Sequence, residues 1–217
     1  MNKSPNPLVV SLLVTLLFLA SASQLSRANA SGIAFRSVAA INPPLHTTNG
    51  QFGADVAALG DLNGDGVGDL AVVNQSNRVY ILFMRANGTV LSYKYHSLGL
   101  NGLPAPSGSG GFKEAVESLG DLDGDGVVDI AVGDPWGASY GSVWILFLKA
   151  DGTLKAYQRI ASNVGGFTGP LTDGARFGAS IAYLGDIDAD GNKEIAVGSP
   201  QGKPGTASVP ARCGFST

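Results

Sequence analysis

The sequence predicts an all-β protein built from four-stranded antiparallel blades that form part of a β-propeller, and three observations lead to this fold class. A segment that begins at Phe52 recurs from Phe112 and again from Phe177, at intervals of 60 and 65 residues, as expected for an array of repeated β units. Glycine (31 residues) and proline (11 residues) are abundant in the 217-residue chain, which suits short strands joined by tight turns. Asn-Gly and Asp-Gly pairs mark hairpins at equivalent places of the first two repeats.

Each complete repeat has the pattern of four short strands. In the first repeat they are predicted at residues 56–59, 70–73, 79–83 and 90–95, with counterparts in the second. The last hairpin is marked by Asn87-Gly88 in the first repeat and Asp151-Gly152 in the second. These pairs favour two-residue type I′ turns, in which both central residues need positive φ.

The predicted repeats cover residues 52–111, 112–176 and 177–217, and the third is predicted to be incomplete. Where the second repeat has the strand pattern of residues 141–147, the third reaches Pro210, which cannot donate to a strand ladder. Three repeats are also fewer than a closed ring contains. A fragment, an open arc and a unit that associates with copies of itself therefore all stay open.

The first 30 residues are predicted to be a secretory signal peptide. Residues 8–20 form an uncharged apolar run, and small residues follow it in two A-x-A patterns that end at Ala22 and Ala30. The run is shorter than the ~20 residues that span a bilayer. We therefore expect a secreted, extracellular or cell-surface protein without a membrane span in the mature chain, cleaved after Ala22 or Ala30. Residues 31–51 are predicted to be a closing strand (residues 32–40) and a linker.

The overall charge and the cysteine content exclude several classes of function. The formal net charge of −3 gives no broad basic surface, so a nucleic-acid partner is not expected. The single cysteine, Cys213, permits neither an intrachain disulfide nor a cysteine-based zinc cluster.

Each repeat contains a nine-residue acidic loop, and the three loops begin at Asp61, Asp121 and Asp186. Oxygen-bearing side chains occupy positions 1, 3, 5 and 9, and glycine at position 6 permits a sharp turn. The loops hold 11 of the 17 acidic residues, and so many close carboxylates repel one another unless a cation neutralises them. Three loops with one spacing favour metal sites over ordinary solvated turns.

Oxygen donors in an adaptable loop indicate Ca²⁺ rather than Mg²⁺. With the backbone carbonyl of position 7 included, the predicted ligands are Asp61, Asn63, Asp65, Val67, Asp69, Asp121, Asp123, Asp125, Val127, Asp129, Asp186, Asp188, Asp190, Asn192 and Glu194. The loops are not EF-hands, because valine stands at position 12 in place of glutamate. Ala189 replaces a glycine of the other two loops, so the third loop deviates most from the pattern.

These motifs resemble the FG-GAP repeat of integrin α-subunits. Phe52-Gly53 and Phe177-Gly178 match the first half of that name, and Gly133-Asp134-Pro135 and Gly198-Ser199-Pro200 match the second half loosely. The second repeat departs from the pattern with Phe112-Lys113. The resemblance implies a propeller fold, Ca²⁺ in each loop, and recognition of an extracellular or cell-surface protein or glycan in adhesion. It identifies no ligand, and self-association is a further possibility.

Enzymatic activity is not predicted. The sequence Gly137-Ala138-Ser139-Tyr140-Gly141 fits G-x-S-x-G, but a nucleophile elbow needs a strand, a sharp turn and a helix, and strand patterns flank this segment on both sides. The alternative function is an accessory propeller module or fragment of a secreted hydrolase. Asn74 and Asn87 begin glycosylation sequons. Trp144 is expected in the core, and Trp136 in a loop.

Overall fold

The computed structural model describes residues 51–137 and 139–201 and the backbone of residues 211–213. The chain divides into two units, Met1–Ala39 and Ala40–Thr217, and all described residues belong to the second. The predicted signal peptide, the closing strand and most of the tail of the third repeat lie outside the described residues.

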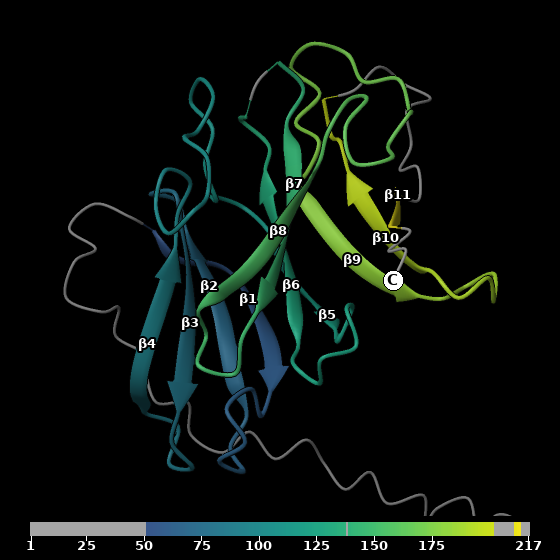
Figure 1. The fold of residues 1–217 in the computed structure, drawn as a ribbon. Helices are drawn as coiled ribbons and strands as arrows, with labels where there is room; N and C mark the ends of the chain where they lie inside the picture. Colours follow the sequence, from purple (N-terminus) through teal and green to yellow (C-terminus); the bar gives the residue numbers. More distant parts are fainter. Residues whose placement is uncertain (1–50, 138, 202–210, 214–217) are drawn as a thin grey trace, which may run out of the picture. The chain divides into compact units, whose positions relative to one another are not determined.

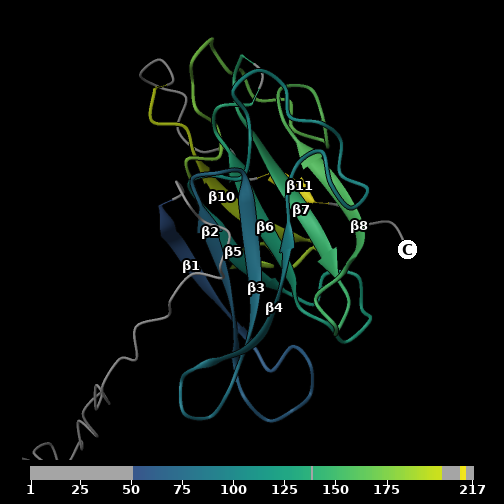
Figure 2. The ribbon, with the colours of Figure 1, turned by 90° about the vertical axis from the view of Figure 1, so that its left-hand side faces the viewer.

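The described chain forms three antiparallel sheets, one from each repeat (Figures 1 and 2). Two sheets have four strands in sequence order, and in the third sheet β10 lies between β9 and β11. The strands are β1 (Phe52–Gly60), β2 (Asp69–Asn74), β3 (Arg78–Met84), β4 (Val90–His96), β5 (Val116–Gly120), β6 (Asp129–Asp134), β7 (Ser142–Leu148), β8 (Leu154–Ile160), β9 (Ser180–Gly185), β10 (Lys193–Gly198) and β11 (Ala211–Cys213). The prediction of all-β, four-stranded blades is confirmed.

The repeats also share their strand register. Val72 of β2 pairs with Tyr80 of β3, and in the second blade Val132 pairs with Trp144. A register shift falls at the end of the third strand in both blades. Positions that match in sequence therefore occupy matching places in the two sheets.

The predicted turn type of the last hairpin is wrong. In the first blade the amide of Gly88 donates to the carbonyl of Arg85 over 2.8 Å. Gly88 has φ 82°, while Asn87 is not among the residues with positive φ. A two-residue type I′ turn needs positive φ at both positions, so the loop is instead a longer hairpin closed by a left-handed glycine. The Asn87 side chain accepts the amide of Thr89 over 3.0 Å, which stabilises this longer turn.

The apolar core lies between successive sheets. Alternating residues of the first sheet, including Val73 and Ile81, pack in one buried cluster with Val132 and Trp144 of the second. The opposite face of the second sheet, including Ile145, packs in another cluster with the third sheet. Both faces of the middle sheet are thus buried, because side chains alternate between faces along a strand. Trp144 is buried, as predicted.

The first strands of the three sheets contact one another in sequence order, β1 with β5 and β5 with β9. Two carboxylates join them: Asp55 accepts the amide of Val116 over 2.9 Å, and Glu117 accepts the amide of Tyr183 over 3.1 Å. Successive blades therefore share hydrogen bonds as well as apolar contacts.

The Phe-Gly pair of the third repeat meets the Gly-x-Pro segment of the second repeat at the boundary between their blades. A Cβ atom on Gly133, in the second repeat, would lie 2.0 Å from the carbonyl oxygen of Gly178, in the third repeat. A Cβ atom on Gly178 would lie 2.4 Å from the carbonyl oxygen of Ser142, and Gly178 has φ 98°. Glycine is required at both positions, because the backbones of adjacent repeats touch there.

Apart from short turns, the secondary structure of the described residues consists of strands. Among the described residues, no helix could span a membrane.

Candidate metal centres

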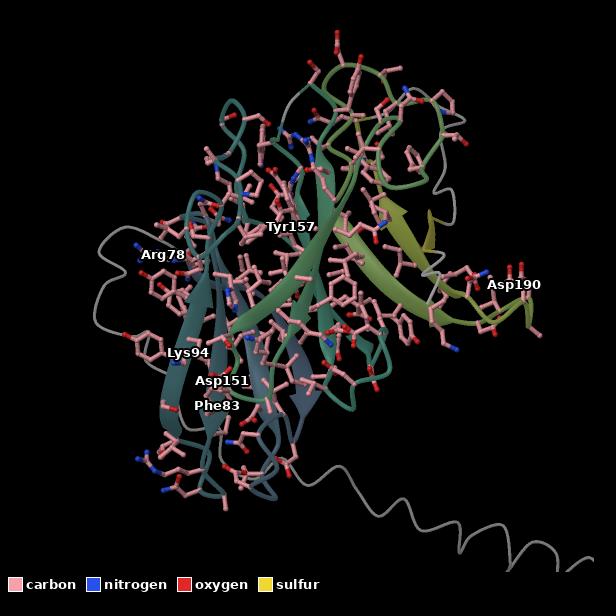
Figure 3. All side chains as sticks on the ribbon, in the orientation of Figure 1. Arg78, Phe83, Lys94, Asp151, Tyr157 and Asp190 are labelled. Atoms are coloured by element: carbon pink, nitrogen blue, oxygen red, sulfur yellow. The ribbon has the colours of Figure 1, made fainter. Side chains whose placement is uncertain are left out.

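Each acidic loop joins the first strand of a blade to the second. The loops follow β1, β5 and β9, and their position 9 lies in the following strand, at Asp69 of β2, Asp129 of β6 and Glu194 of β10. The loops are thus fixed at both ends by paired strands. Asp190 of the third loop projects from the end of its blade (Figure 3).

The aspartate at position 1 organises each loop through backbone hydrogen bonds. In the second loop, Asp121 Oδ1 accepts the amide of Asp125 over 3.0 Å, and Oδ2 accepts the amide of Gly126 over 2.8 Å. Asp61 and Asp186 accept the corresponding amides in the first and third loops. The same spacing therefore produces the same turn three times.

Glycine at position 6 permits this turn in all three loops. Gly66, Gly126 and Gly191 have φ of 86°, 85° and 90°, a region that L side chains rarely adopt. At position 4 the third loop keeps a left-handed backbone although it has no glycine there, since Ala189 has φ 60°. The strain of a non-glycine residue in this region is about 1–2 kcal/mol.

The acidic residue at position 9 is buried and links the loop to the sheet. Asp129 accepts the amide of Leu122 in the loop over 3.0 Å and the amide of Leu148 in β7 over 3.1 Å. Asp69 makes the same two bonds, to Leu62 and Met84. Both aspartates are fully or almost fully buried, so their carboxylates are structural parts of the blade as well as candidate ligands.

Glu194 differs from these two aspartates. Its Oε2 accepts the amide of Ile187 over 2.9 Å, but its Oε1 is buried without a hydrogen-bond partner. The side chain is only 3% exposed. A buried carboxylate oxygen without a partner is costly, and a cation at this point would remove the cost.

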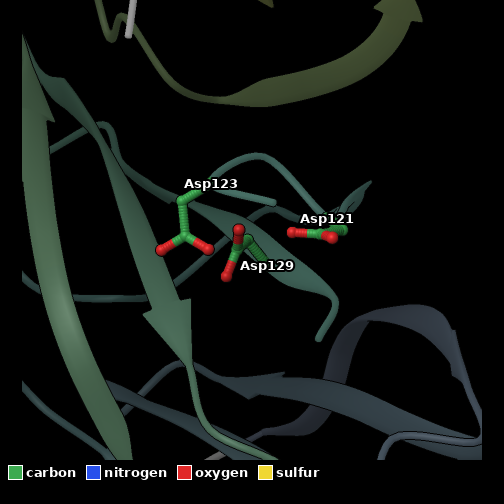
Figure 4. Close-up of side chains that lie close together, drawn as sticks. All are labelled: Asp121, Asp123 and Asp129. Atoms are coloured by element: carbon green, nitrogen blue, oxygen red, sulfur yellow. The ribbon is translucent and has the colours of Figure 1, made fainter. Parts of the chain in front are cut away.

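Three carboxylates converge in the second loop and three in the third. One oxygen from each of Asp121, Asp123 and Asp129 lies within 4.8 Å of the others, and their side chains gather at one point (Figure 4). Asp186, Asp188 and Glu194 form an equivalent group. Positions 1, 3 and 9 thus provide three candidate metal ligands in each of these loops.

In the first loop Asn63 stands at position 3, and the described residues there contain no group of three converging carboxylates. Asn63 Oδ1 accepts the amide of Asp65 over 2.9 Å. Its Nδ2 donates to Asp65 Oδ2 over 3.0 Å. The loop keeps the shape of the other two with one charge fewer.

The predicted ligands at positions 5 and 7 are bonded to each other in all three loops. The amide of Val67 donates to Asp65 Oδ1 over 2.9 Å, and Val127 and Asn192 donate to Asp125 and Asp190 in the same way. The aspartates at position 5 are not members of the converging groups. Ligation by positions 5 and 7 stays a prediction.

The charges of the second loop affect one another. Burial raises the pKa of Asp129 to about 6, the amides of Leu122 and Leu148 partly offset this, and the nearby charges of Asp123 and Asp125 raise the pKa further. Hydrogen bonding to Lys155 is the main cause that lowers the pKa of Asp125. The ionised form of Asp129 is thus disfavoured where other carboxylates are close.

Lys155 is a residue of this site that sequence reasoning missed. Its Nζ lies 2.9 Å from Asp123 Oδ2 and also forms an ion pair with Asp125 Oδ2. Lys155 belongs to β8 and is 30 residues from Asp125 in sequence. A search for loop motifs cannot find such a contact, because the strand register of the blade brings it about.

The G-x-S-x-G segment is not part of a strand–turn–helix unit. It is followed by the strand β7, and its Ala138 lies outside the described residues. The carbonyl of Ser139 accepts the amide of Gly174 over 2.8 Å. His96 is buried, and its Nε2 is 2.9 Å from the carbonyl oxygen of Gly152. These features fit a structural loop and a structural histidine.

Comparison with known proteins identifies the repeats. A model of the FG-GAP-like repeat matches residues 61–132 and 121–197. The chain is 32% identical to integrin alpha-4 of Xenopus laevis over 158 residues, which is 68% of this chain and 14% of that protein. It is 31% identical to human integrin alpha-IIb over 177 residues, which is 71% of this chain and 16% of that protein.

A third relative, integrin alpha-PS5 of Drosophila melanogaster, is 39% identical over 85 residues, which is 37% of this chain and 8% of that protein. The chain thus spans only a small part of the length of each of these relatives. The family match covers three acidic loops and the strands between them. The chain belongs to the FG-GAP-like repeat family and is distantly homologous to the N-terminal region of integrin α-subunits.

Proposed function

We propose that the chain is a secreted, Ca²⁺-binding module for extracellular protein recognition or cell adhesion, in which calcium has a structural role. The observation that carries the metal proposal is the convergence of three carboxylates in the second and third loops. Bound calcium would neutralise these charges and hold the donors of each loop at one point.

The donor set fits a hard cation. The converging atoms are all carboxylate oxygens, which are ligands that Ca²⁺ prefers. The partnerless, buried Oε1 of Glu194 is an independent sign that the third loop is incomplete without a cation. Mg²⁺ demands a stricter octahedral geometry at shorter distances, whereas the more adaptable coordination of Ca²⁺ suits a loop in which side-chain and backbone oxygens share one site.

The chain's own residues would transmit this binding to the blades. Asp129 connects the second loop to β7 through the amide of Leu148. Fixing this carboxylate would therefore restrain both the loop and the strand. We expect calcium to raise the melting temperature, because a ligand that binds only the native state adds stability by mass action.

The proposal of a recognition role depends on family membership and on one exposed aromatic residue. Trp136 is 37% exposed, its Nε1 donates to Glu114 over 2.9 Å, and the Arg176 guanidinium lies 3.8 Å from its ring centroid. The ring is thus held in place while part of it stays accessible, as in contact residues that bind with little loss of side-chain entropy. The predicted signal peptide agrees with an extracellular location.

Thermal unfolding in excess Ca²⁺ and in chelator tests the calcium proposal. We expect a higher melting temperature with Ca²⁺ and a smaller effect with Mg²⁺ at the same concentration. Identical melting curves in Ca²⁺ and chelator would refute a structural calcium site.

The recognition proposal requires a separate experiment. The purified chain, immobilised on a surface, should retain cells in Ca²⁺, and Trp136→Ala should reduce retention while the melting temperature stays unchanged. Equal retention by the wild type and by a denatured control would contradict the proposal. Fusion of residues 1–30 to a reporter, with the medium assayed for the reporter, tests secretion.

A further inference from the structure

We propose that Lys155 is a built-in counter-cation of the second acidic loop, which stabilises this loop without metal and competes with Ca²⁺ for its carboxylates. This inference rests on the proposed calcium function and adds a regulatory element to one of its sites. The second loop would then bind Ca²⁺ more weakly than its four carboxylates suggest.

The first argument is the position of the ammonium group. Lys155 Nζ lies 2.9 Å from Asp123 Oδ2 and forms a second ion pair with Asp125 Oδ2. Asp123 is also one of the three carboxylates that converge in this loop. A Ca²⁺ ion at the converging oxygens would thus share a ligand with the lysine, and the two cations would repel each other.

The second argument is a comparison inside the molecule. Strand pairing places Leu154 opposite Leu148 in the second blade and Val90 opposite Met84 in the first. Leu91 of the first blade is therefore the structural equivalent of Lys155. The oxygen that Lys155 binds in the second loop, Oδ2 of position 5, is bound in the first loop by the neutral amide of Asn63.

The first two loops differ in sequence in the same way as they differ in the group that binds Oδ2 of position 5. The first loop has asparagine at position 3 and leucine on the adjacent strand, whereas the second has Asp123 and Lys155. The additional carboxylate and the lysine thus occur together. The pKa of Lys155 is raised by its hydrogen bonds to Asp125 and Asp123, which agrees with an ammonium group attracted to both carboxylates.

The lysine is able to leave the loop. Its side chain is 38% exposed, so the ammonium group can move into water when a stronger cation arrives. Exposed ion pairs are weak, and a divalent ion held by several oxygens replaces them at modest cost. Lys155 therefore sets the threshold for calcium binding without blocking the site.

The experiment measures Ca²⁺ binding to the full chain by NMR, with the backbone amides of Gly66, Gly126 and Gly191 as reporters of the first, second and third loops. The variants are Lys155→Leu, which introduces the residue found at this place in the first blade, and Lys155→Arg, which keeps the charge. Lys94→Leu is the matched control. It removes one positive charge from β4, in another blade (Figure 3).

We expect Lys155→Leu to tighten Ca²⁺ binding at the second loop about three- to tenfold, with unchanged affinity at the third loop. The same variant should melt at a lower temperature in chelator, because the carboxylates lose their counter-cation. Lys155→Arg and Lys94→Leu should bind as the wild type does. Leu91→Lys should weaken any Ca²⁺ binding at the first loop.

Two failures are distinguishable in this experiment. If the wild type and Lys155→Leu bind Ca²⁺ at the second loop with equal affinity, the competition is refuted while the calcium function stands. If no reporter responds to Ca²⁺ in any variant, the proposed calcium function itself is wrong. If Lys94→Leu tightened Ca²⁺ binding at the second loop as much as Lys155→Leu did, the effect would come from the overall charge of the protein, and the inference would also be overturned.

Discussion

Replacement of Asp129 by alanine should destabilise the protein even when no metal is bound. The carboxylate of Asp129 is fully buried and accepts the amides of Leu122 and Leu148. Both amides would lose their partner in Asp129→Ala. The prediction separates a structural role of this residue from its role as a candidate calcium ligand.

The magnitude follows from the two lost hydrogen bonds. The amide of Leu148 is buried, and a buried donor without a partner costs about 1–3 kcal/mol. Leu122 is only partly buried, so its amide loses the net value of a hydrogen bond, about 0.5–1.5 kcal/mol. Together the two losses reduce the free energy of unfolding by about 1.5–4.5 kcal/mol. Water that enters the space left by the carboxylate would move the value toward the lower end. Because native domains are stable by only about 5–15 kcal/mol, the loss should be easy to measure.

The assay is urea unfolding in the presence of chelator, which removes any contribution from bound metal. Asp125→Ala is the control in the same loop, because Asp125 is exposed and the loss of its ion pair with Lys155 should lower the urea midpoint much less than Asp129→Ala does. A midpoint for Asp129→Ala equal to that of the wild type would refute the reasoning. A loss seen only in Ca²⁺ would show that Asp129 acts through the metal alone.

Three further predictions test the packing, the titration and the surface of the blades. Gly178→Ala should destabilise the protein by about 2 kcal/mol or more, because its Cβ would meet the carbonyl of Ser142 at 2.4 Å. Gly53→Ala is the control, since Gly53 has φ 84° and nothing within 4 Å of an added Cβ, so this variant should be destabilised only by the strain of positive φ. The urea midpoints of the two variants test this difference. Burial lowers the pKa of His96 below 6.5, so the unfolded state binds the proton first and stability should fall as pH drops below 6.5. His96→Gln should remove this part of the pH dependence, and unchanged slopes of unfolding free energy against pH would contradict it. In a glycosylating secretory host, we expect glycan on Asn87, which is exposed, and none on Asn74, which is fully buried. Mass spectrometry of the secreted protein tests this, and glycan on Asn74 would show that this part of the blade is open when the protein is modified.

Much of the fold could be predicted from sequence because its signals are local. Strand patterns of a few residues and the acidic loops repeat at matching places, and each loop is closed by hydrogen bonds within nine residues, such as Asp121 to Gly126. The hairpin turns were predicted at the correct places but with the wrong type. Asn87-Gly88 favours two left-handed residues, and the register shift next to Met84 instead leaves a longer loop that needs only one.

Taken alone, the sequence determined the four-stranded blades, the position of the loops and the residue types that could bind a cation, since these depend on neighbours along the chain. Only the tertiary structure decided which carboxylates converge, that Glu194 has a buried oxygen without a partner, and that Lys155 reaches Asp123 and Asp125. The close approach of Gly133 and Gly178 was likewise decided only by the tertiary structure. The physical reason is that strand pairing and blade packing bring together residues that are tens of positions apart, and no local pattern records those distances.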